Sequence, residues 1–320
     1  MIQDKRILLT GGAGFIGTKL CSLLSYNNEI LIYDSLNRNS IKNTDLLDKS
    51  NVKLVQGDIL DFNHVKSVVD EFKPNIVIHL AAVAGIDTVI KSPVNTMKVN
   101  MIGTYNILEA VKENNIERFI DFSTSEVFGS YAYKVDEQHT TNLAPVGEAR
   151  WTYSVSKLAG EHLAHSYYNE YKIPIVTVRP FNVYGPGQVG EGAIHQFVVR
   201  AIRDEEMQIH GDGDQIRSWC YIDDFVDGIM LCIEKKEAIG QSFNIGNPRG
   251  TVTISMLAQL IKRIANSKSK IVYVPKNYVD VELRIPNIDK AKEILNYEPK
   301  YDLAEGLEKT IEWYRGVTND

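Results

Sequence analysis

Two side chains that together could move a proton lie one helical turn apart, in "RWTYSVSKLAGEHL" (150–163), whose pattern predicts a helix. Tyr153 and Lys157 occupy positions i and i+4, so they share one face of that helix. A free tyrosine has a pKa of about 10 and is a poor acid or base at neutral pH. A lysine ammonium one turn away would stabilise the phenolate and lower that pKa. The pair predicts an acid–base centre; the alternative is an exposed helical pair without catalytic function.

Further reactive side chains follow an apolar run, in "DFSTSEVFG" (121–129). Thr124, Ser125 and Glu126 stand where a turn rich in glycine, asparagine or proline would be ordinary. Two hydroxyls and a carboxylate at the end of a strand indicate a site that handles protons or hydrogen-bonds a substrate. The alternative for Glu126 is a carboxylate that only caps a loop amide.

A glycine-rich segment, "GGAGFIG" (11–17), lies between the first predicted strand and the first predicted helix. It satisfies both Gly12-x-Gly14-x-x-Gly17 and Gly11-x-x-Gly14-x-x-Gly17. Glycines let the backbone turn tightly and approach a pyrophosphate, which then meets the amide groups at the start of the helix. The strand–loop–helix context makes this a dinucleotide-binding prediction rather than an ordinary turn.

The second predicted strand ends in "YDSLNR" (33–38), which places Asp34 where an acid binds both hydroxyls of an adenosine ribose. A carboxylate there repels a 2′-phosphate, so the sequence favours NAD over NADP. Arg38 is close enough in sequence to offer the opposite preference, and Asp34 as a simple turn residue is a further alternative.

The elements that must hold these residues alternate between apolar runs and segments of helical length. Continuous apolar runs are expected of parallel strands buried on both faces, so the chain predicts a Rossmann-type, doubly wound parallel α/β sheet. We expect an NAD-binding domain over 1–180, with the strand 242–245 returning to its sheet, and a smaller α/β substrate domain over 181–320. Predicted strands are 6–10, 29–33, 52–56, 75–80, 118–123, 174–178, 242–245 and 271–274; predicted helices are 15–25, 62–72, 94–114, 150–163, 192–204, 223–235, 253–265 and 302–315.

The composition excludes several classes of protein. The 320 residues are 44% apolar and 24% charged with a formal charge of −6, which is ordinary for a globular protein and argues against a nucleic-acid partner. Three cysteines without CxxC spacing predict neither a disulfide framework nor a metal site. Without a long apolar window, we expect no membrane association and a cytoplasmic location.

These motifs together resemble the extended short-chain dehydrogenases/reductases, in the nucleotide-sugar epimerase/dehydratase family. The resemblance covers essentially the whole chain. It is carried by "TGGAGFIG", "QGDILD", "HLAA", "STSEVFG", "YSVSK", "VRPFNVYGPG" and "GDGDQIRSWCYIDD".

The resemblance implies a role for each matching position. Thr124 would help Tyr153 polarise a sugar hydroxyl, and Lys157 would also bind the nicotinamide ribose. Asn182 and Arg217 would contact the nucleotide sugar, Arg217 through its diphosphate. The implied NAD contacts are Gly11, Gly14, Phe15, Ile16 and Gly17 at the pyrophosphate, Asp34 at the ribose, Asp58 and Ile59 beside the adenine, and Leu80, Ala81 and Ala82 along the middle of the dinucleotide.

The resemblance also narrows the reaction. In this family the sugar C4 is oxidised first, and members that eliminate a group carry an acid–base residue at the position of Glu126. Dehydratases pair an aspartate with that glutamate, but Ser125 stands here, and Thr-Ser-Glu resembles UDP-glucuronate decarboxylases and some GDP-mannose dehydratases. "GDQIRSW" is closer to glucose 4,6-dehydratases.

The predicted enzyme is therefore a UDP-hexuronate decarboxylase or a sugar-nucleotide 4,6-dehydratase, with Thr124, Ser125, Glu126, Tyr153 and Lys157 as its catalytic group. A nucleotide-sugar 4-epimerase is the alternative, and a non-catalytic NAD-binding protein a remote one. The resemblance also implies a homodimer.

Overall fold

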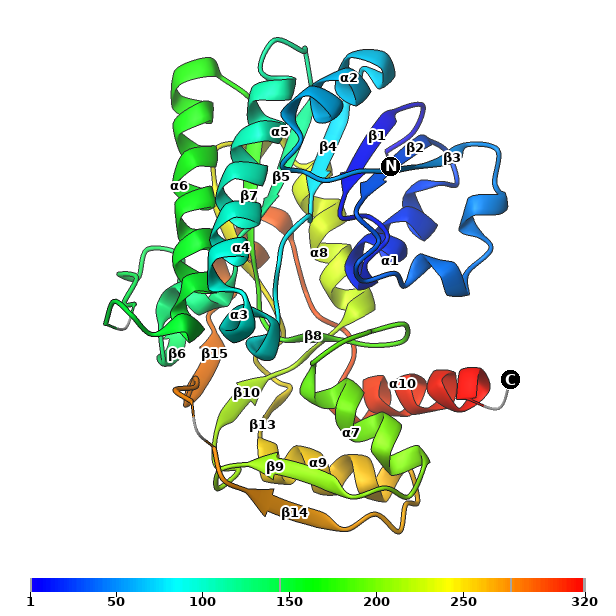
Figure 1. Ribbon diagram of the computed structural model, residues 1–320, viewed down its shortest axis with the longest axis vertical. Coiled ribbons are helices and arrows are strands. Elements are labelled where there is room, and N and C mark those ends of the chain that lie inside the picture. Colours follow the sequence, from blue (N-terminus) through cyan, green and yellow to red (C-terminus); the bar gives the residue numbers. More distant parts are fainter. Residues whose placement is uncertain (1, 144, 277, 319–320) are drawn as a thin grey trace.

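A parallel sheet of seven strands forms the centre of the upper lobe of the protein (Figure 1). The computed structural model describes residues 2–143, 145–276 and 278–318. The strand order is β12-β7-β5-β4-β1-β2-β3, and each neighbouring pair is parallel, which confirms the predicted Rossmann-type doubly wound fold. The strands are β1 (Arg6–Thr10), β2 (Glu29–Asp34), β3 (Val52–Gln56), β4 (Ile76–His79), β5 (Arg118–Phe122), β7 (Ile175–Pro180) and β12 (Ser242–Ile245).

Helices cover both faces of this sheet, because apolar side chains run along each central strand without interruption and point alternately to either side. Leu8 and Phe119 belong to a buried cluster with α2, α5 and α6, whereas Ile7 and Leu9 belong to the cluster with α1 and α8. The bounds of these helices are α1 (Phe15–Leu24), α2 (Phe62–Phe72), α5 (Gly103–Val111), α6 (Thr152–Tyr171) and α8 (Ile222–Glu234).

The second lobe is built mainly from residues after 180, and its organisation is less regular. A four-stranded sheet has the order β13-β10-β15-β6, and two further strand pairs are β8 with β11 and β9 with β14. The elements are β6 (Tyr131–Val135), β8 (Val183–Tyr184), α7 (Ala193–Ile202), β9 (Met207–His210), β10 (Ile216–Ser218), β11 (Cys220–Tyr221), β13 (Thr251–Thr253), α9 (Ile254–Ile264), β14 (Ile271–Val274), β15 (Leu283–Pro286) and α10 (Leu303–Thr318).

Several features of the structure differ from the sequence-based prediction. The helix predicted over 150–163 continues to Tyr171, and no strand was predicted at β6, β8, β9, β10, β11, β13 or β15. The helix expected over 94–114 is α4 (Pro93–Met97), a π-helical turn (Lys98–Ile102) and α5. The strand β6 lies in the sequence between β5 and β7 of the upper lobe, but it pairs with β15 of the second lobe. The two lobes are therefore joined by a strand pair as well as by the crossing chain.

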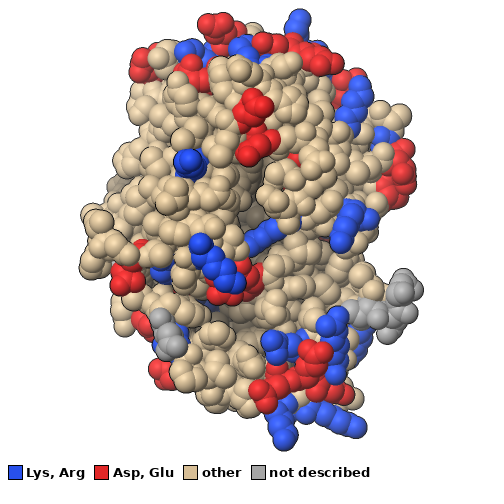
Figure 2. All heavy atoms as spheres, viewed as in Figure 1, with Lys and Arg blue, Asp and Glu red and all other residues tan. Residues whose placement is uncertain are grey.

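The surface is hollowed between the two lobes, and basic and acidic side chains gather around the hollow (Figure 2). A cavity of about 700 Å³ lies here, lined by residues from the carboxyl ends of the sheet strands and from the second lobe. This is the position at which open α/β sheets bind their ligands. Within the part of the chain that the structure describes, no helix is long and apolar enough to cross a membrane.

Candidate active site

The predicted acid–base pair lies at the start of α6, and Tyr153 lines the cavity together with Thr124. Thr124 follows β5 and begins a short 3₁₀ turn, Ser125–Phe128, whose Glu126 amide it caps at 3.2 Å. Its hydroxyl also bonds to the phenol of Tyr153. The structure thus brings the strand-end hydroxyl and the helix tyrosine together, as the sequence predicted.

The pKa of Tyr153 differs from the expected direction. Burial raises it to about 12 and the charge of Glu126 adds to this, while the bond from Thr124 and the charge of Arg150 oppose it. The lowering expected from Lys157 is not seen, so in this structure Tyr153 is held as a neutral phenol. A positive charge brought in by a ligand would be needed to lower that pKa.

Lys157 is deeply buried, with only 4% of its surface exposed. Burial lowers its pKa, and the nearby carboxylates of Asp121 and Glu161 work against that effect. The start of α6 is fixed beneath it: Asn100 donates to the Ser156 hydroxyl at 3.0 Å, and Ser156 donates to the Tyr153 carbonyl at 2.8 Å. Sequence reasoning missed Asn100, although a polar residue on the buried side of a predicted helix was a usable signal.

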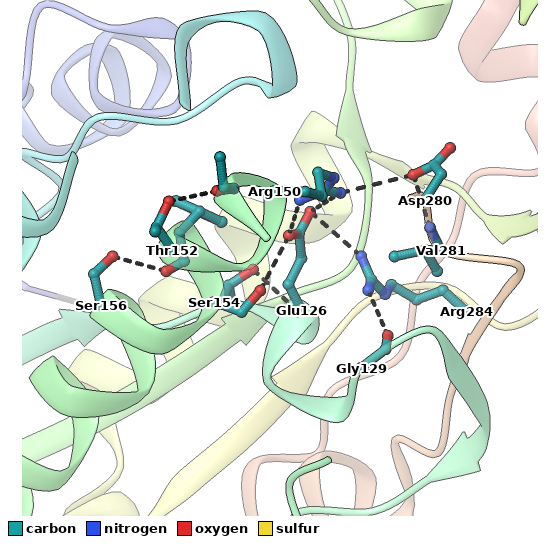
Figure 3. A network of polar contacts seen from close by, with 12 residues as sticks. Glu126, Gly129, Arg150, Thr152, Ser154, Ser156, Asp280, Val281 and Arg284 are labelled. Atoms are coloured by element: carbon teal, nitrogen blue, oxygen red, sulfur yellow. Dashed lines mark hydrogen bonds and ion pairs between the residues drawn. The ribbon is translucent and has the colours of Figure 1, made fainter. Parts of the chain in front are cut away.

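Glu126 lies in a cluster of buried charges on the wall of the cavity (Figure 3). Arg150 donates to both of its oxygens, at 2.5 and 2.9 Å, and Arg284 lies 3.6 Å away. Asp280 lies between Arg150 at 3.7 Å and Arg217 at 3.5 Å. Three guanidinium groups therefore share two carboxylates, and the cluster has an excess of positive charge.

This environment fixes the protonation state of Glu126. Burial alone would raise its pKa, but the charges of Arg150 and Arg284 and the bonds from Arg150 lower it below its ordinary value. Its carboxylate accepts from Arg150 and from the Ser154 hydroxyl at 3.4 Å, and from no loop amide of the described residues, so the capping alternative is wrong. Ser125 is buried beside it on the same wall of the cavity.

Arg150 and Arg284 were not singled out from the sequence. Arg150 lies three residues before Tyr153 inside a motif that was recognised, so its position was available as a signal. Arg284 comes from β15, more than a hundred residues later, and no local pattern places it opposite Glu126.

The residues expected to bind the substrate both line the cavity from the second-lobe side. Arg217, on β10, donates to the Val281 carbonyl and is only 8% exposed. Asn182 adopts a left-handed backbone conformation with φ of 40°, and its amide donates to the Ser218 carbonyl at 2.9 Å. Both are therefore held in place by backbone contacts.

The glycine loop has the shape that a dinucleotide needs. A Cβ on Gly11 would lie 2.5 Å from the Ala81 amide nitrogen, and one on Gly17 would lie 2.5 Å from the Gly12 Cα. The backbone of the loop therefore lies so close to the segment after β4 and to the start of α1 that no side chain fits at either position. A Cβ on Gly14 would meet only the Gly11 carbonyl, at 3.4 Å, which leaves open space above the first turn of α1. The residues present fit a pyrophosphate on this helix end.

Asp34 is buried at the end of β2, where it accepts bonds from the Ala13 amide at 2.9 Å and the Leu36 amide at 2.7 Å. Burial raises its pKa, and those two bonds oppose the rise. Arg38 does not lie free beside it: its guanidinium donates to the Ala84 carbonyl at 2.7 Å and pairs with Glu191 at 3.6 Å.

The remaining predicted cofactor residues lie along the same edge of the sheet. Phe15 and Ile16 form the first turn of α1, and Leu80 to Ala82 follow β4. Asp58 accepts a bond from the Leu60 amide at 2.9 Å, and the Ile59 carbonyl accepts one from the Asn106 side chain at 2.9 Å. Their contact with an adenine stays a prediction.

The chain is similar to known proteins over almost its whole length. The family model for GDP-mannose 4,6 dehydratase matches residues 8–310. A UDP-N-acetyl-alpha-D-glucosaminuronate decarboxylase of Bacillus cytotoxicus is 31% identical over 99% of this chain and 100% of its own length. A dTDP-D-glucose 4,6-dehydratase of Homo sapiens is 34% identical over 97% of this chain and 90% of its own. A crystal structure of UDP-glucuronic acid 4-epimerase from Bacillus cereus, in complex with UDP-glucuronic acid and NAD, superimposes with a TM-score of 0.87 at 30% identity, covering 98% of this chain and 99% of that one.

Proposed function

Since the chain belongs to the GDP-mannose 4,6 dehydratase family, we propose that it is an NAD-dependent enzyme that decarboxylates a nucleotide-linked hexuronate through a transient 4-keto sugar. The relatives are enzymes that act on nucleotide sugars, and one structural neighbour holds NAD. The glycine loop, the open end of α1 and Asp34 would hold that dinucleotide. When bound, NAD supplies a hydride acceptor for the sugar C4 and a positively charged ring.

With the positive charge that bound NAD would add, Tyr153 ionises and is then the base that receives the proton of the C4 hydroxyl, while Thr124 holds that hydroxyl in line. Lys157 supports the phenolate from beneath. Asn182 contacts the nucleotide sugar, and Arg217, which adjoins the charge cluster through Asp280, binds its diphosphate. The guanidinium of Arg217 can make two parallel bonds to phosphate oxygens.

The observation that carries the choice of reaction is the arginine cluster around Glu126. The Nε atoms of Arg150 and Arg284 are buried and have no hydrogen-bond partner among the described residues, which suits a sugar that carries a carboxylate at C6. Glu126 is kept ionised by Arg150 and Arg284, so it holds no proton to give to a departing hydroxyl, as dehydration would require.

Loss of CO₂ needs no such proton. With a ketone at C4, the bond between C5 and C6 breaks, CO₂ leaves, and the electron pair passes to the C4 oxygen. Tyr153 and Thr124 stabilise the enolate there, and C5 then takes up a proton. The C4 ketone finally regains its hydride, and the C4 oxygen takes back a proton from Tyr153. Arg150, held by Glu126, orients the carboxylate of the sugar. After CO₂ has left, the negative charge of Glu126 still balances the positive charge of the arginine.

Dehydration and 4-epimerisation remain the competing reactions, because a 4,6-dehydratase at 34% identity and a 4-epimerase at 30% identity are also similar to this chain. Incubation with UDP-, dTDP-, GDP- and CDP-linked sugars, followed by mass spectrometry, separates all three. Loss of CO₂ from a hexuronate supports the proposal; loss of water, or an isomer of unchanged mass, would replace it. Absence of any product from the whole panel would favour the non-catalytic NAD-binding alternative.

The proposal extends to the organisation of the protein. We assign residues 1–180, with strand 242–245, to NAD binding and residues 181–320 mainly to the substrate. Buried free thiols at Cys21, Cys220 and Cys232 are consistent with the reducing cytoplasm.

A homodimer would bury an exposed apolar surface on α4, the π-helical turn, α5 and α6. Its residues are Val94, Ile102, Tyr105, Val155 and Tyr171, between 39% and 69% exposed. Light scattering of the Ile102→Glu variant tests this: a monomer is expected, and an unchanged dimer would exclude this surface.

A further inference from the structure

A row of polar side chains crosses the seven-stranded sheet beneath the active site. Thr10, His79, Asp121, Thr177 and Ser242 are in register on neighbouring parallel strands, β1, β4, β5, β7 and β12. Residues in register point to the same face of a sheet. The face is that of α5 and α6, because His79 bonds to Thr104 and Ser242 bonds to Glu161. The row therefore lies below the helix that carries Tyr153 and Lys157.

All five side chains are buried, and the outer members are well satisfied. His79 bonds to Thr10 at 2.7 Å and to Thr104 at 3.0 Å, and burial lowers its pKa to about 3, so it is neutral. Asp121 differs from them. The hydrogen bond that its carboxylate receives from the described side chains comes from Thr177 and is long, at 3.4 Å.

Two carboxylates act on the charge of Lys157, those of Asp121 and Glu161. Glu161 is already balanced, because Arg179 donates to it at 2.8 and 3.1 Å, and Ser123 and Ser242 donate at 2.6 and 2.7 Å. Asp121 has no such arginine among the described residues. No hydrogen bond, and no ion pair within 4.0 Å, joins Asp121 to Lys157, so the charge of Asp121 acts on the ammonium group of Lys157 across the buried space between β5 and α6.

We propose that Asp121 is the counter-ion of Lys157, a positioning residue that keeps the lysine charged in its buried site and so supports proton transfer by Tyr153. The inference rests on the proposed function of Lys157 and Tyr153. An ammonium without a partner would lose its proton on burial. The groups that face Asp121 are Lys157 and Glu161 from α6, Thr177 from β7, and the neutral His79 from β4. Burial raises the pKa of Asp121 to about 6, and the charge of Lys157 opposes the rise, so Asp121 carries its negative charge above that pH.

A titration of the full-length protein without substrate tests this directly. In protein labelled with ¹³C-lysine, the Cε resonance of Lys157 is identified by its absence from Lys157→Met. It should show a step near pH 6, when Asp121 ionises. Asp121→Asn keeps the shape of the side chain, and should remove that step and lower the pKa of Lys157 by roughly one unit or more.

The matched control is Thr177→Val, which changes a neighbour in the same buried row without removing a charge. It should leave the pKa of Lys157 close to that of the parent. An unchanged Lys157 in Asp121→Asn would overturn the proposal. If that variant does not fold, the parent titration still decides, because absence of the step near pH 6 would also overturn it.

Activity provides a second readout. The ratio of parent kcat to Asp121→Asn kcat should be close to one below pH 6, where Asp121 is protonated in the parent, and should rise with pH above it. A loss that is equal at every pH would make the role purely structural and overturn the proposal. Because the lysine titration needs no substrate, failure of the proposed reaction leaves its result interpretable.

Discussion

Replacing Glu126 by glutamine should strengthen the binding of a hexuronate and slow its turnover. The structure places Glu126 on one side of the Arg150 guanidinium, at 2.5 and 2.9 Å. A substrate carboxylate bound to the other side would lie roughly 7 Å from Glu126. At an effective dielectric constant of about 20, the repulsion between two such charges is about 2 kcal/mol, which corresponds to roughly thirtyfold in affinity. Removing the charge of Glu126 removes that repulsion and stabilises the bound carboxylate before CO₂ leaves.

Calorimetry in a Tyr153→Phe background, which should bind substrate without converting it, measures this effect. UDP-glucuronate should bind about thirtyfold more tightly when Glu126→Gln is added. UDP-glucose, which has a hydroxymethyl group in place of the carboxylate, is the matched control and should be unaffected. Equal changes for both sugars, or none for either, would show that the arginine cluster does not read a C6 carboxylate. Accumulation of a 4-keto sugar in the single Glu126→Gln variant with unchanged affinity would instead make Glu126 a proton carrier after C4 oxidation.

The remaining predictions concern the cofactor, the base, the diphosphate and stability. NAD should bind more tightly than NADP, because Asp34 faces a 2′-phosphate; equal affinities in calorimetry would contradict this. Tyr153→Phe should lower turnover by roughly 10²–10⁴ while substrate binding survives, and a variant that keeps most of its turnover would exclude it as the base. Arg217→Lys should raise KM with little change in NAD affinity, since lysine cannot make two parallel bonds; an unchanged KM would place Arg217 in a structural ion pair. His79 has a folded-state pKa of about 3, below its unfolded value, so its contribution to stability is present above about pH 6.5 and is lost as pH falls toward 3. Denaturant unfolding should show a shallower acid loss for His79→Gln, and an identical pH dependence would refute this.

The upper lobe could be predicted from sequence because its information is local. Apolar runs such as Arg6–Thr10 form strands that are buried on both faces, and a glycine-rich turn or a segment with helical periodicity follows each of them. Each strand can therefore be recognised from a short window of sequence. The strands of the second lobe have two to five residues and pair over long distances in the chain, as β6 does with β15. Their pairing depends on tertiary packing, which no short window of sequence contains.

The same distinction applies to the site. Tyr153 and Lys157 are four residues apart, and Thr124 follows a recognisable strand, so the reacting centre was predictable from spacing and from family resemblance. The Arg150–Glu126–Arg284 cluster was not, because it assembles three segments of the chain. The direction of the Tyr153 pKa also depends on burial and on Glu126, and both appear only in three dimensions.

The strand pair β6–β15 has a consequence for protein engineering. The chain leaves the upper lobe just after Glu126, and β6 then pairs with β15 in the sheet of the second lobe. Conversely, β12 comes from the later half of the chain and pairs with β7 in the sheet of the upper lobe. Each sheet therefore contains a strand from the other half of the chain. A chimera that joins halves of two proteins near residue 180 would replace one strand in each sheet with a strand from a different protein. New sugar specificity must therefore be introduced by substituting side chains in the cavity wall, with the interlocked backbone left intact.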